Sequence, residues 1–277
     1  MTIVSRFAPS PTGHLHLGHA YAALSAWRTA SEAGGRFLLR IEDIDRQRCR
    51  PAFEADLLED LSWLGLDWEQ PVRRQSEHFA DYRAALARLE ALGVVYPCFC
   101  SRKDIALAGG APHDADQDGP PYPGRCRDLA AAEAAARIAE GRPYATRLDV
   151  AGALALTGPL SWHDRAAGPQ QAQPERLGDV VLARRDTPTS YHLSVTVDDA
   201  LQGVTLVSRG RDLFTATHIH RLLQALLGLS TPGYHHHGLL NGADGKRLSK
   251  RDGALTIRAL RESGHTVAEV RGLAGFS

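Results

Sequence analysis

The stretch that most constrains the fold of this chain runs from Arg6 to Ala20 and reads RFAPSPTGHLHLGHA. An apolar run from Ile3 to Phe7, which overlaps the start of this stretch, predicts a short strand that Pro9 and Pro11 terminate. The small residues that follow Gly13 predict the start of a helix. A helix N-terminus at the carboxyl end of a strand is where open α/β sheets bind ligands, and its unpaired N–H groups favour anions.

His16 and His19 lie three residues apart, so they share one helical face and both imidazoles can reach a bound phosphate. The same spacing also fits an ordinary strand–helix turn with surface histidines, because strand–turn–helix units are common. Lysine use is a sharper signal. Among 32 basic residues only three are lysine, Lys103, Lys246 and Lys250, and two of them lie in GKRLSKRDG. This concentration indicates that a compact, mobile ammonium is needed there.

The bulk properties restrict the class of protein only broadly. A chain of 277 residues suits one large or two modest domains, and its formal net charge of +0 gives no compositional support for a nucleic-acid partner. The sequence contains neither a signal peptide nor a membrane-length apolar run, so we expect a cytoplasmic protein with no membrane partner.

A second strand is predicted over 36–41, and Glu42, Asp43 and Asp45 follow directly at its carboxyl end. Carboxylates there can hold an ammonium group or a magnesium ion beside the first crevice. A solvated acidic turn paired with the neighbouring arginines is the alternative. Helical spacing of apolar residues predicts helices over 51–64 and 76–92, with Ser76 as N-cap of the second.

The middle of the chain contains a candidate metal site. A strand predicted over 94–100 runs into Cys98 and Cys100, and Cys126 follows a loop rich in Gly, Pro and Asp. Three cysteines supply soft ligands, and a tetrahedral zinc needs a fourth. Tyr122 and His113 are the nearby candidates; histidine is the usual ligand, whereas a tyrosine phenolate is rare. Buried thiols without a metal remain an alternative, and the isolated Cys49 is interpreted as a packed or surface thiol.

The second half of the chain continues the α/β pattern. We expect a helix over 128–140 capped by Asp128, and irregular connections with short strands over 151–176. From 177 onward the predicted elements are a strand at 180–182, a helix near 190–197, a strand at 204–208 and a helix over 214–227.

Two residues of that second half, Tyr191 and Arg209, fall at the ends of predicted elements, where they can face the same crevice as Arg6. His218 and His220 are interpreted as structural or surface residues. The run of histidines at 235–237 is discounted as a metal site, because three consecutive side chains do not converge on one ion.

Taken together, these motifs resemble the catalytic half of class I glutamyl-tRNA synthetases. His16-Leu17-Gly18-His19, preceded by RFAPSPTG, resembles the HIGH signature, and RLSKR at 247–251 resembles the KMSKS loop with Arg and Leu in place of Lys and Met. RIEDIDRQR, YHLSVTVDDALQGVTLVSRGRDL and His236 match the glutamate subgroup. The resemblance implies an α/β fold, a class I aminoacyl-tRNA synthetase Rossmann-type catalytic domain with an inserted zinc-containing acceptor-binding subdomain.

The same resemblance implies a division of the chain into four parts. These are a first half of the catalytic domain (1–94), the inserted subdomain (95–176), a second half of the catalytic domain (177–229), and the KMSKS-like loop with a short C-terminal segment (230–277). Only 27 residues follow Lys250 in this sequence, too few for an anticodon-binding domain, so we expect none.

This length makes the chain resemble the truncated paralogues, the glutamyl-queuosine tRNA(Asp) synthetases. That resemblance implies a ligase that activates L-glutamate with ATP to glutamyl-adenylate without tRNA. It then transfers glutamate to the queuosine base at the wobble position of tRNA(Asp). The alternatives are a truncated glutamyl-tRNA synthetase that charges a tRNA 3′ end, and a non-catalytic tRNA-binding paralogue. The signature histidines and lysine argue against the last of these, and we expect a monomer.

The roles of individual residues also come from the resemblance. The catalytic residues are His16, His19 and Lys250, which with Gly18 bind ATP; magnesium neutralises the charge of the phosphates. Glutamate is bound by Arg6, Ala8, Ser10, Glu42, Tyr191 and Arg209. Within this set, Arg6 and Arg209 select the carboxylates, and Glu42 and Tyr191 hold the ammonium. One structural Zn²⁺ is held by Cys98, Cys100, Tyr122 and Cys126.

Overall fold

The computed structural model describes residues 2–101, 104, 122–240 and 256–276. The strands are β1 (Val4–Phe7), β2 (Arg36–Ile41), β3 (Glu69–Arg74), β4 (Val95–Cys98), β5 (Ala145–Leu148), β6 (Ser161–Asp164), β7 (Gly168–Gln171), β8 (Val181–Arg184), β9 (Leu206–Gly210) and β10 (Gly233–His237). The α-helices are α1 (Leu17–Glu32), α2 (Pro51–Trp63), α3 (Phe79–Ala91), α5 (Ala131–Ala139), α6 (Val150–Thr157), α7 (Tyr191–Leu201), α8 (Ala216–Leu226), α9 (Ile257–Glu262) and α10 (Val267–Leu273). Three short 3-10 turns lie at Gln75–Glu77 (η1), Pro174–Leu177 (η2) and Arg211–Leu213 (η3).

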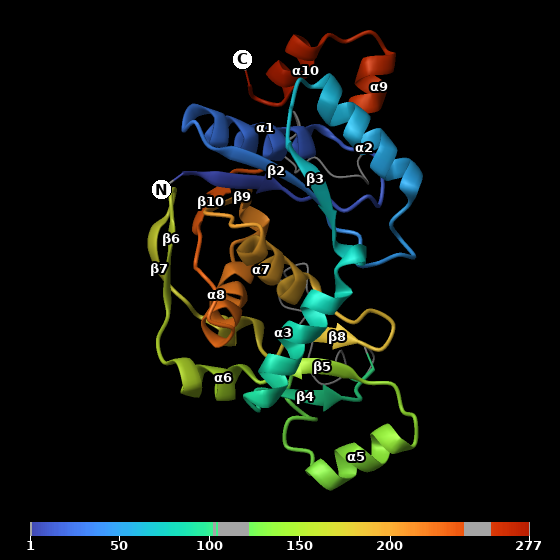
Figure 1. Ribbon diagram of the computed structural model, residues 1–277, viewed down its shortest axis with the longest axis vertical. Coiled ribbons are helices and arrows are strands. Elements are labelled where there is room, and N and C mark those ends of the chain that lie inside the picture. Colours follow the sequence, from blue (N-terminus) through green and yellow to red (C-terminus); the bar gives the residue numbers. More distant parts are fainter. Residues whose placement is uncertain (1, 102–103, 105–121, 241–255, 277) are drawn as a thin grey trace.

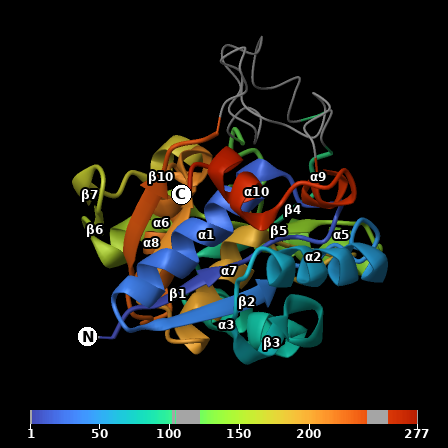
Figure 2. The same cartoon turned by 90° about the horizontal axis from the view of Figure 1, so that it is seen from above.

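The main layer is a mostly parallel arrangement of strands. Strands β1, β2 and β3 pair in parallel, and so do β9, β10 and β6, while β7 closes the second group in antiparallel orientation. The two groups meet where the Thr205 N–H donates to the Val4 carbonyl over 3.0 Å. Helices α1 and α10 lie on one face of β1 and β2, and α3 and α7 lie on the other, as the side view shows (Figure 1); in the view from above α1 covers these strands (Figure 2). Helices on both faces of a parallel sheet define the predicted Rossmann-type α/β fold, which is thereby confirmed.

The sequence of the first two strands explains why they form the centre of this layer. All four residues of β1 and five of the six residues of β2 are buried, as expected for parallel strands covered on both faces. The predicted boundaries of β2 are confirmed. Its neighbours in the core include the buried face of α1, with Ala20, Ala23 and Leu24, and Leu57 of α2.

A second, smaller sheet contains Cys98, the first cysteine of the candidate metal site. Strands β4, β5 and β8 pair in antiparallel orientation, and together with α5 they lie at the end of the molecule opposite α9 and α10 (Figure 1). Pairings cross the boundary expected at 176/177, because β6 joins β10 in the main sheet and β8 joins β5 in the small one. The two sheets therefore alternate along the chain, and the four-part division stays a prediction.

Three local predictions were wrong. Ser76 does not cap the third helix; it lies in η1 and donates both its backbone N–H and its hydroxyl to Asp43, while α3 begins at Phe79. Asp128 is not a cap either, since α5 starts at Ala131 without a side-chain cap. The segment expected to hold irregular connections and short strands does contain β6 and β7, but it begins with helix α6, whose N-terminus is capped by Asp149. Burial of Val150 and Ala153 against the core outweighs the helix-breaking tendency of Gly152.

No helix among the described residues is long and apolar enough to cross a membrane.

Helix α2 contains an unusual buried carboxylate, which makes a testable prediction about stability. Asp60 is fully buried, and among the described residues neither of its carboxylate oxygens has a hydrogen-bond partner; Nη2 of Arg261 lies 3.8 Å from Oδ1. Burial raises the pKa of Asp60 from 3.8 to about 6. The folded state therefore disfavours the ionised form, and its stability falls as pH rises from about 4 through about 6.

We expect Asp60→Asn to be more stable than the wild type at pH 8, by up to about 3 kcal/mol, with little difference at pH 4. Thermal unfolding at both pH values measures this. The exposed Asp128 provides the control, because Asp128→Asn should shift the two melting temperatures equally. A difference for Asp60→Asn that does not grow with pH would show that this carboxyl is not the titrating group.

Candidate active site

The HIGH-like residues form the N-terminal cap of α1. The Gly18 N–H donates to Nδ1 of His16 over 3.1 Å, and the His16 N–H donates to Nδ1 of His19 over 3.2 Å. The two rings lie against each other at a tilt of 31°, with their centroids 3.8 Å apart. An imidazole whose Nδ1 accepts a hydrogen bond has its proton on Nε2 in the neutral form, so both rings present Nε2–H donors.

Gly18 leaves room for the imidazole ring of His16. A Cβ atom at this position would lie 3.0 Å from Cε1 of His16, which is tighter than an ordinary contact. The small residue thus allows the imidazole of His16 to fold back over the first turn of α1.

The chain that follows the KMSKS-like sequence returns to the HIGH-like residues. Thr256 forms an isolated antiparallel bridge with His16, and the Ile257 N–H donates to the Leu15 carbonyl over 2.9 Å. Residues just after the KMSKS-like sequence are therefore held against the HIGH-like residues, although they are far apart in sequence. Lys250 itself lies outside the described residues.

At the carboxyl ends of β1 and β2, two buried arginines share one carboxylate. Arg6 donates from Nε and Nη2 to the two oxygens of Asp199, over 3.0 and 3.3 Å, and from Nη1 to the Ser208 carbonyl over 3.4 Å. Arg40 donates from Nη1 to Asp199 over 2.8 Å and from Nη2 to Glu42 over 3.2 Å. These contacts connect β1, β2, α7 and β9 through one continuous group of charges.

Burial and charge compete in setting the pKa values of this group. Burial acts to raise the pKa of the Asp199 carboxyl, but the guanidinium groups of Arg6 and Arg40 outweigh it and lower that pKa. For Glu42 burial prevails, so its pKa is raised even though Arg40 lies beside it. Burial also acts to lower the pKa of Arg40, yet the carboxylates of Asp199 and Glu42 outweigh it, and that pKa is raised. The ionised form of Asp199 is therefore favoured, whereas Glu42 shares Arg40 with Asp199 and keeps a raised pKa.

The remaining glutamate-site candidates lie around the same group. Arg209, at the end of β9, donates from Nη1 to the Tyr191 hydroxyl over 3.0 Å. The loop after β1 adjoins Glu42, whose N–H donates to the Pro9 carbonyl over 2.9 Å. Ala8 is half-buried and Ser10 is exposed on either side of that contact. Burial raises the pKa of Tyr191, and the charges of Arg209, Glu42, Arg6 and Asp199 act on the same hydroxyl. The structure thus brings together the candidates predicted from separate parts of the sequence.

The charge balance of this group indicates what kind of ligand suits it. Three guanidinium groups, those of Arg6, Arg40 and Arg209, face the two carboxylates of Glu42 and Asp199. Arg6 and Arg40 are ion-paired with these carboxylates, and Arg40 also lies 3.7 Å from Asp198. The buried guanidinium of Arg209 has only uncharged partners among the described residues, which favours a ligand that brings a carboxylate of its own.

Sequence reasoning missed Arg40 and Asp199. A signal for Arg40 exists, because a charged residue inside the apolar strand RFLLRI is buried only with a partner. Asp199 lies in the VDDALQG segment, but nothing in the sequence identifies which strand it faces. Of the acidic residues that follow β2, Asp43 accepts from Ser76 and Asp45 accepts from the backbone of its own turn, so Glu42 is the one that faces the site.

The cysteine group of the small sheet converges as predicted. The sulfur atoms of Cys98, Cys100 and Cys126 lie within 4.8 Å of one another, close enough to hold one metal ion. The Tyr122 hydroxyl is 3.4 Å from the Cys100 sulfur and accepts from the Cys126 N–H over 2.9 Å. Soft thiolates in this arrangement fit zinc. His113 lies outside the described residues.

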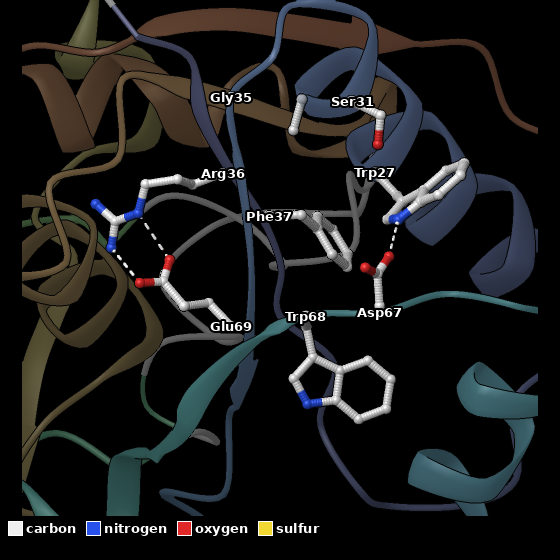
Figure 3. A pocket seen from close by; sticks show the side chains of 9 residues that line it. Trp27, Ser31, Gly35, Arg36, Phe37, Asp67, Trp68 and Glu69 are labelled. Carbon is white, nitrogen blue, oxygen red and sulfur yellow. Dashed lines mark hydrogen bonds and ion pairs between the residues drawn. The ribbon is translucent and has the colours of Figure 1, made fainter.

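A pocket of about 330 Å³ lies elsewhere, at the start of β2 and β3 (Figure 3). Its wall includes the rings of Trp27, Phe37 and Trp68 and the ion pair between Arg36 and Glu69, whose atoms are 2.7 Å apart. This is the amino end of the parallel strands, opposite the edge where the candidate residues gather. None of the predicted site residues lines it.

The fold and site correspond to one class of protein. The family model described as tRNA synthetases class I (E and Q), catalytic domain, matches residues 2–273. A glutamyl-Q tRNA(Asp) synthetase of Rhodobacter capsulatus is 51% identical and covers 99% of this chain and 100% of its own length, and one of Symbiobacterium thermophilum is 46% identical over 98% and 84%. The chain belongs to the glutamyl-Q tRNA(Asp) synthetase family of class I tRNA synthetases.

The likeness extends to solved structures. A glutamate-tRNA synthetase of Elizabethkingia anophelis superposes with a TM-score of 0.83 at 28% identity. The match covers 99% of this chain and 61% of that one, so the chain spans about three fifths of that synthetase.

Proposed function

We propose that this chain activates L-glutamate with ATP to glutamyl-adenylate without tRNA, and then transfers glutamate to the queuosine base at the wobble position of tRNA(Asp). The relatives that match end to end have names that specify this glutamyl-Q and tRNA(Asp) chemistry. Because both ATP and tRNA are cytoplasmic substrates, the proposal includes a cytoplasmic location, with the protein acting as a monomer.

The observation that carries the glutamate proposal is the buried guanidinium of Arg209, whose partners among the described residues are all uncharged. Glutamate has two carboxylates and one ammonium, a net charge of −1, whereas glutamine is neutral. Arg6 and Arg209 suit the carboxylates, because guanidinium donors match planar carboxylate geometry. Glu42, whose second oxygen has no hydrogen-bond partner among the described residues, and the Tyr191 hydroxyl suit the ammonium. Ala8 and Ser10 would border the substrate from the loop after β1.

The activation step requires positioning and charge stabilisation rather than a covalent enzyme group. The substrate α-carboxylate attacks the α-phosphorus of ATP, a P–O bond forms, and pyrophosphate leaves with the electron pair of the broken bond. Negative charge grows on the phosphoryl oxygens. His16 and His19 would donate their Nε2–H groups to these oxygens above Gly18. Lys250 would neutralise the departing pyrophosphate, with magnesium supplied alongside ATP.

For the metal site, we propose one structural zinc held by Cys98, Cys100, Cys126 and Tyr122. The support is that the Tyr122 hydroxyl lies within the sulfur group and is buried with it. Burial raises the pKa of the Tyr122 hydroxyl, so a phenolate there would depend on the metal ion, and the Cys126 N–H that donates to this oxygen would support it.

A second candidate, transfer of glutamate to a tRNA 3′ end, is favoured by the likeness to the solved glutamate-tRNA synthetase. Radiolabelled glutamate mapped on isolated tRNA(Asp) separates the two candidates. Label that depends on queuosine and resists removal of the 3′ terminal nucleotide supports the proposed acceptor. Label that is lost with the 3′ end supports the second candidate.

We expect glutamate-dependent exchange of pyrophosphate into ATP to proceed at full rate in the absence of tRNA. The physical reason is that the charged groups of the site are already held in place by protein partners. The exchange assay with and without tRNA(Asp) tests this. Exchange that starts only after tRNA is added would contradict the proposed activation step.

Lys250→Ala should lower the rate of exchange at least tenfold, equivalent to about 1.4 kcal/mol of barrier. The lost ammonium no longer stabilises the leaving pyrophosphate. Lys103→Ala is the control, because that lysine lies outside the KMSKS-like sequence. Unchanged turnover in Lys250→Ala would remove this residue from its proposed role.

A further inference from the structure

Arg209 is almost completely engaged by its surroundings. Its Nε–H donates to Nε2 of His236 over 3.1 Å, and one Nη2–H donates to the Thr217 hydroxyl over 2.6 Å. Its two Nη1–H groups donate to Tyr191 and, over 3.3 Å, to Nδ1 of His220. Four of the five N–H groups of this guanidinium are therefore used. One Nη2–H is left without a partner among the described residues, so the orientation of the guanidinium group determines where that donor points.

Behind His236 lies a buried carboxylate from the neighbouring strand. Asp164, at the end of β6, accepts with Oδ2 from Nδ1 of His236 over 2.7 Å and from the His236 backbone N–H over 3.0 Å. Its Oδ1 accepts from the N–H groups of Ala166 and Ala167, both over 2.9 Å, in the turn that leads to β7. One oxygen thus shapes the turn, and the other holds the histidine.

This carboxylate dictates which nitrogen of His236 has the proton. With Nδ1–H donating to Asp164, Nε2 is an acceptor, as the Nε–H of Arg209 requires, because a guanidinium has no acceptor atoms. Burial, reinforced by Arg209 and opposed by Asp164, lowers the pKa of His236 to about 3, so the ring is neutral at ordinary pH. A ring with the opposite tautomer would present its Nε2–H to the Nε–H of Arg209, which would lose its acceptor, while the Thr217 hydroxyl, 3.1 Å from Nε2, could accept the histidine proton.

We propose that Asp164 is a positioning residue for glutamate activation, acting through the tautomer of His236 to aim the remaining donor of Arg209 at a substrate carboxylate. The inference rests on the proposed function and extends it to a residue that does not touch the substrate. In this proposal Oδ2 of Asp164 orients His236, whereas Oδ1 stabilises the turn between β6 and β7.

Asp164→Asn tests this with nearly the same shape. An amide that keeps its oxygen on the turn presents NH₂ to His236 and forces the proton onto Nε2. We expect the KM for glutamate in pyrophosphate exchange to rise at least tenfold, while the KM for ATP stays within about twofold. Asp149→Asn, a change at a carboxylate that caps α6, is the matched control and should alter neither constant.

The His236 variants separate positioning from a structural role. Glutamine reaches the place of Nε2 and can still accept from Arg209, whereas asparagine reaches the place of Nδ1 and cannot. We expect His236→Gln to keep most of the affinity for glutamate and His236→Asn to lose it. In the His236→Gln background, Asp164→Asn should have little further effect on the KM for glutamate. An equal loss in both backgrounds would overturn the proposal in favour of a structural role.

A purely electrostatic role for Asp164 predicts the opposite sign. Removing a negative charge would then strengthen glutamate binding, so a lower KM in Asp164→Asn would also overturn the proposal. Long-range ¹H–¹⁵N NMR of the histidine ring reports the tautomer directly and should show Nδ1–H in the wild type and Nε2–H in the variant. Absence of exchange in the wild type itself would instead contradict the proposed function.

Discussion

Arg6→Ala is expected to lower kcat/KM for glutamate about 100-fold, or about 2.7 kcal/mol, while the protein stays folded. The change removes one of the three guanidinium groups of the site, and with it a cationic partner for a substrate carboxylate. It also removes donors that are buried and therefore poorly replaced by water. Asp199 keeps Arg40 as a partner at 2.8 Å, which limits the loss of stability. Pyrophosphate exchange at varied glutamate concentration measures the effect.

Arg36→Ala is the matched control for this variant. Arg36 lies on the same sheet, but at its opposite edge, where it pairs with the exposed Glu69 beside the pocket (Figure 3). Exposed ion pairs contribute little, so neither exchange nor stability should change measurably. Because glutamine lacks the second carboxylate and depends less on a cationic partner, Arg6→Ala should accept glutamine relatively better than the wild type does. Equal kcat/KM of Arg6→Ala and wild type would show that another residue holds that carboxylate.

The second large effect concerns the metal site. Purified protein is expected to contain about one zinc per chain, and Cys126→Ser should lower zinc affinity at least about 100-fold. A serine hydroxyl is a poor substitute for a thiolate, and the three sulfur atoms lie within 4.8 Å in the folded chain. Exposure to a chelator should loosen the small sheet and leave glutamate activation less affected, because the residues of that site lie on the main sheet.

Cys49→Ser supplies the control, since Cys49 belongs to the loop after β2 and not to the sulfur group. Comparison of Tyr122→Phe with His113→Ala identifies the fourth ligand as the residue whose loss weakens zinc binding. Protein purified without chelator that holds no zinc, with all three thiols titrating freely, would overturn the metal proposal.

Most of the catalytic framework was predictable because local signals were strong. The apolar runs at 3–7 and 36–41 are strands, the proline-terminated turn leads into α1, and two histidines three residues apart meet at one helix end. Such features depend on the chain within a few residues, so the sequence encodes them directly. The motif resemblance supplied the family, which the end-to-end relatives confirmed.

The small sheet shows where local patterns fail. β8 follows the return of the α/β pattern and reads as a strand of the main layer, yet it pairs with β5. β6 is one of the short strands expected in the inserted subdomain, yet it pairs with β10 in the main layer. Strand partners are chosen by burial and by backbone hydrogen bonds between distant segments, which no local pattern contains.

The sequence by itself determined which side chains were available for the chemistry: the capping histidines, the arginines of β1 and β9, and three cysteines near one another along the chain. Only the tertiary structure decided how they are held. Asp199 comes 193 residues after Arg6 and accepts hydrogen bonds from its guanidinium. Asp164 lies 72 residues before His236, the histidine that it orients. Buried charges need partners wherever the fold can bring them, so their partners are fixed by packing rather than by sequence distance.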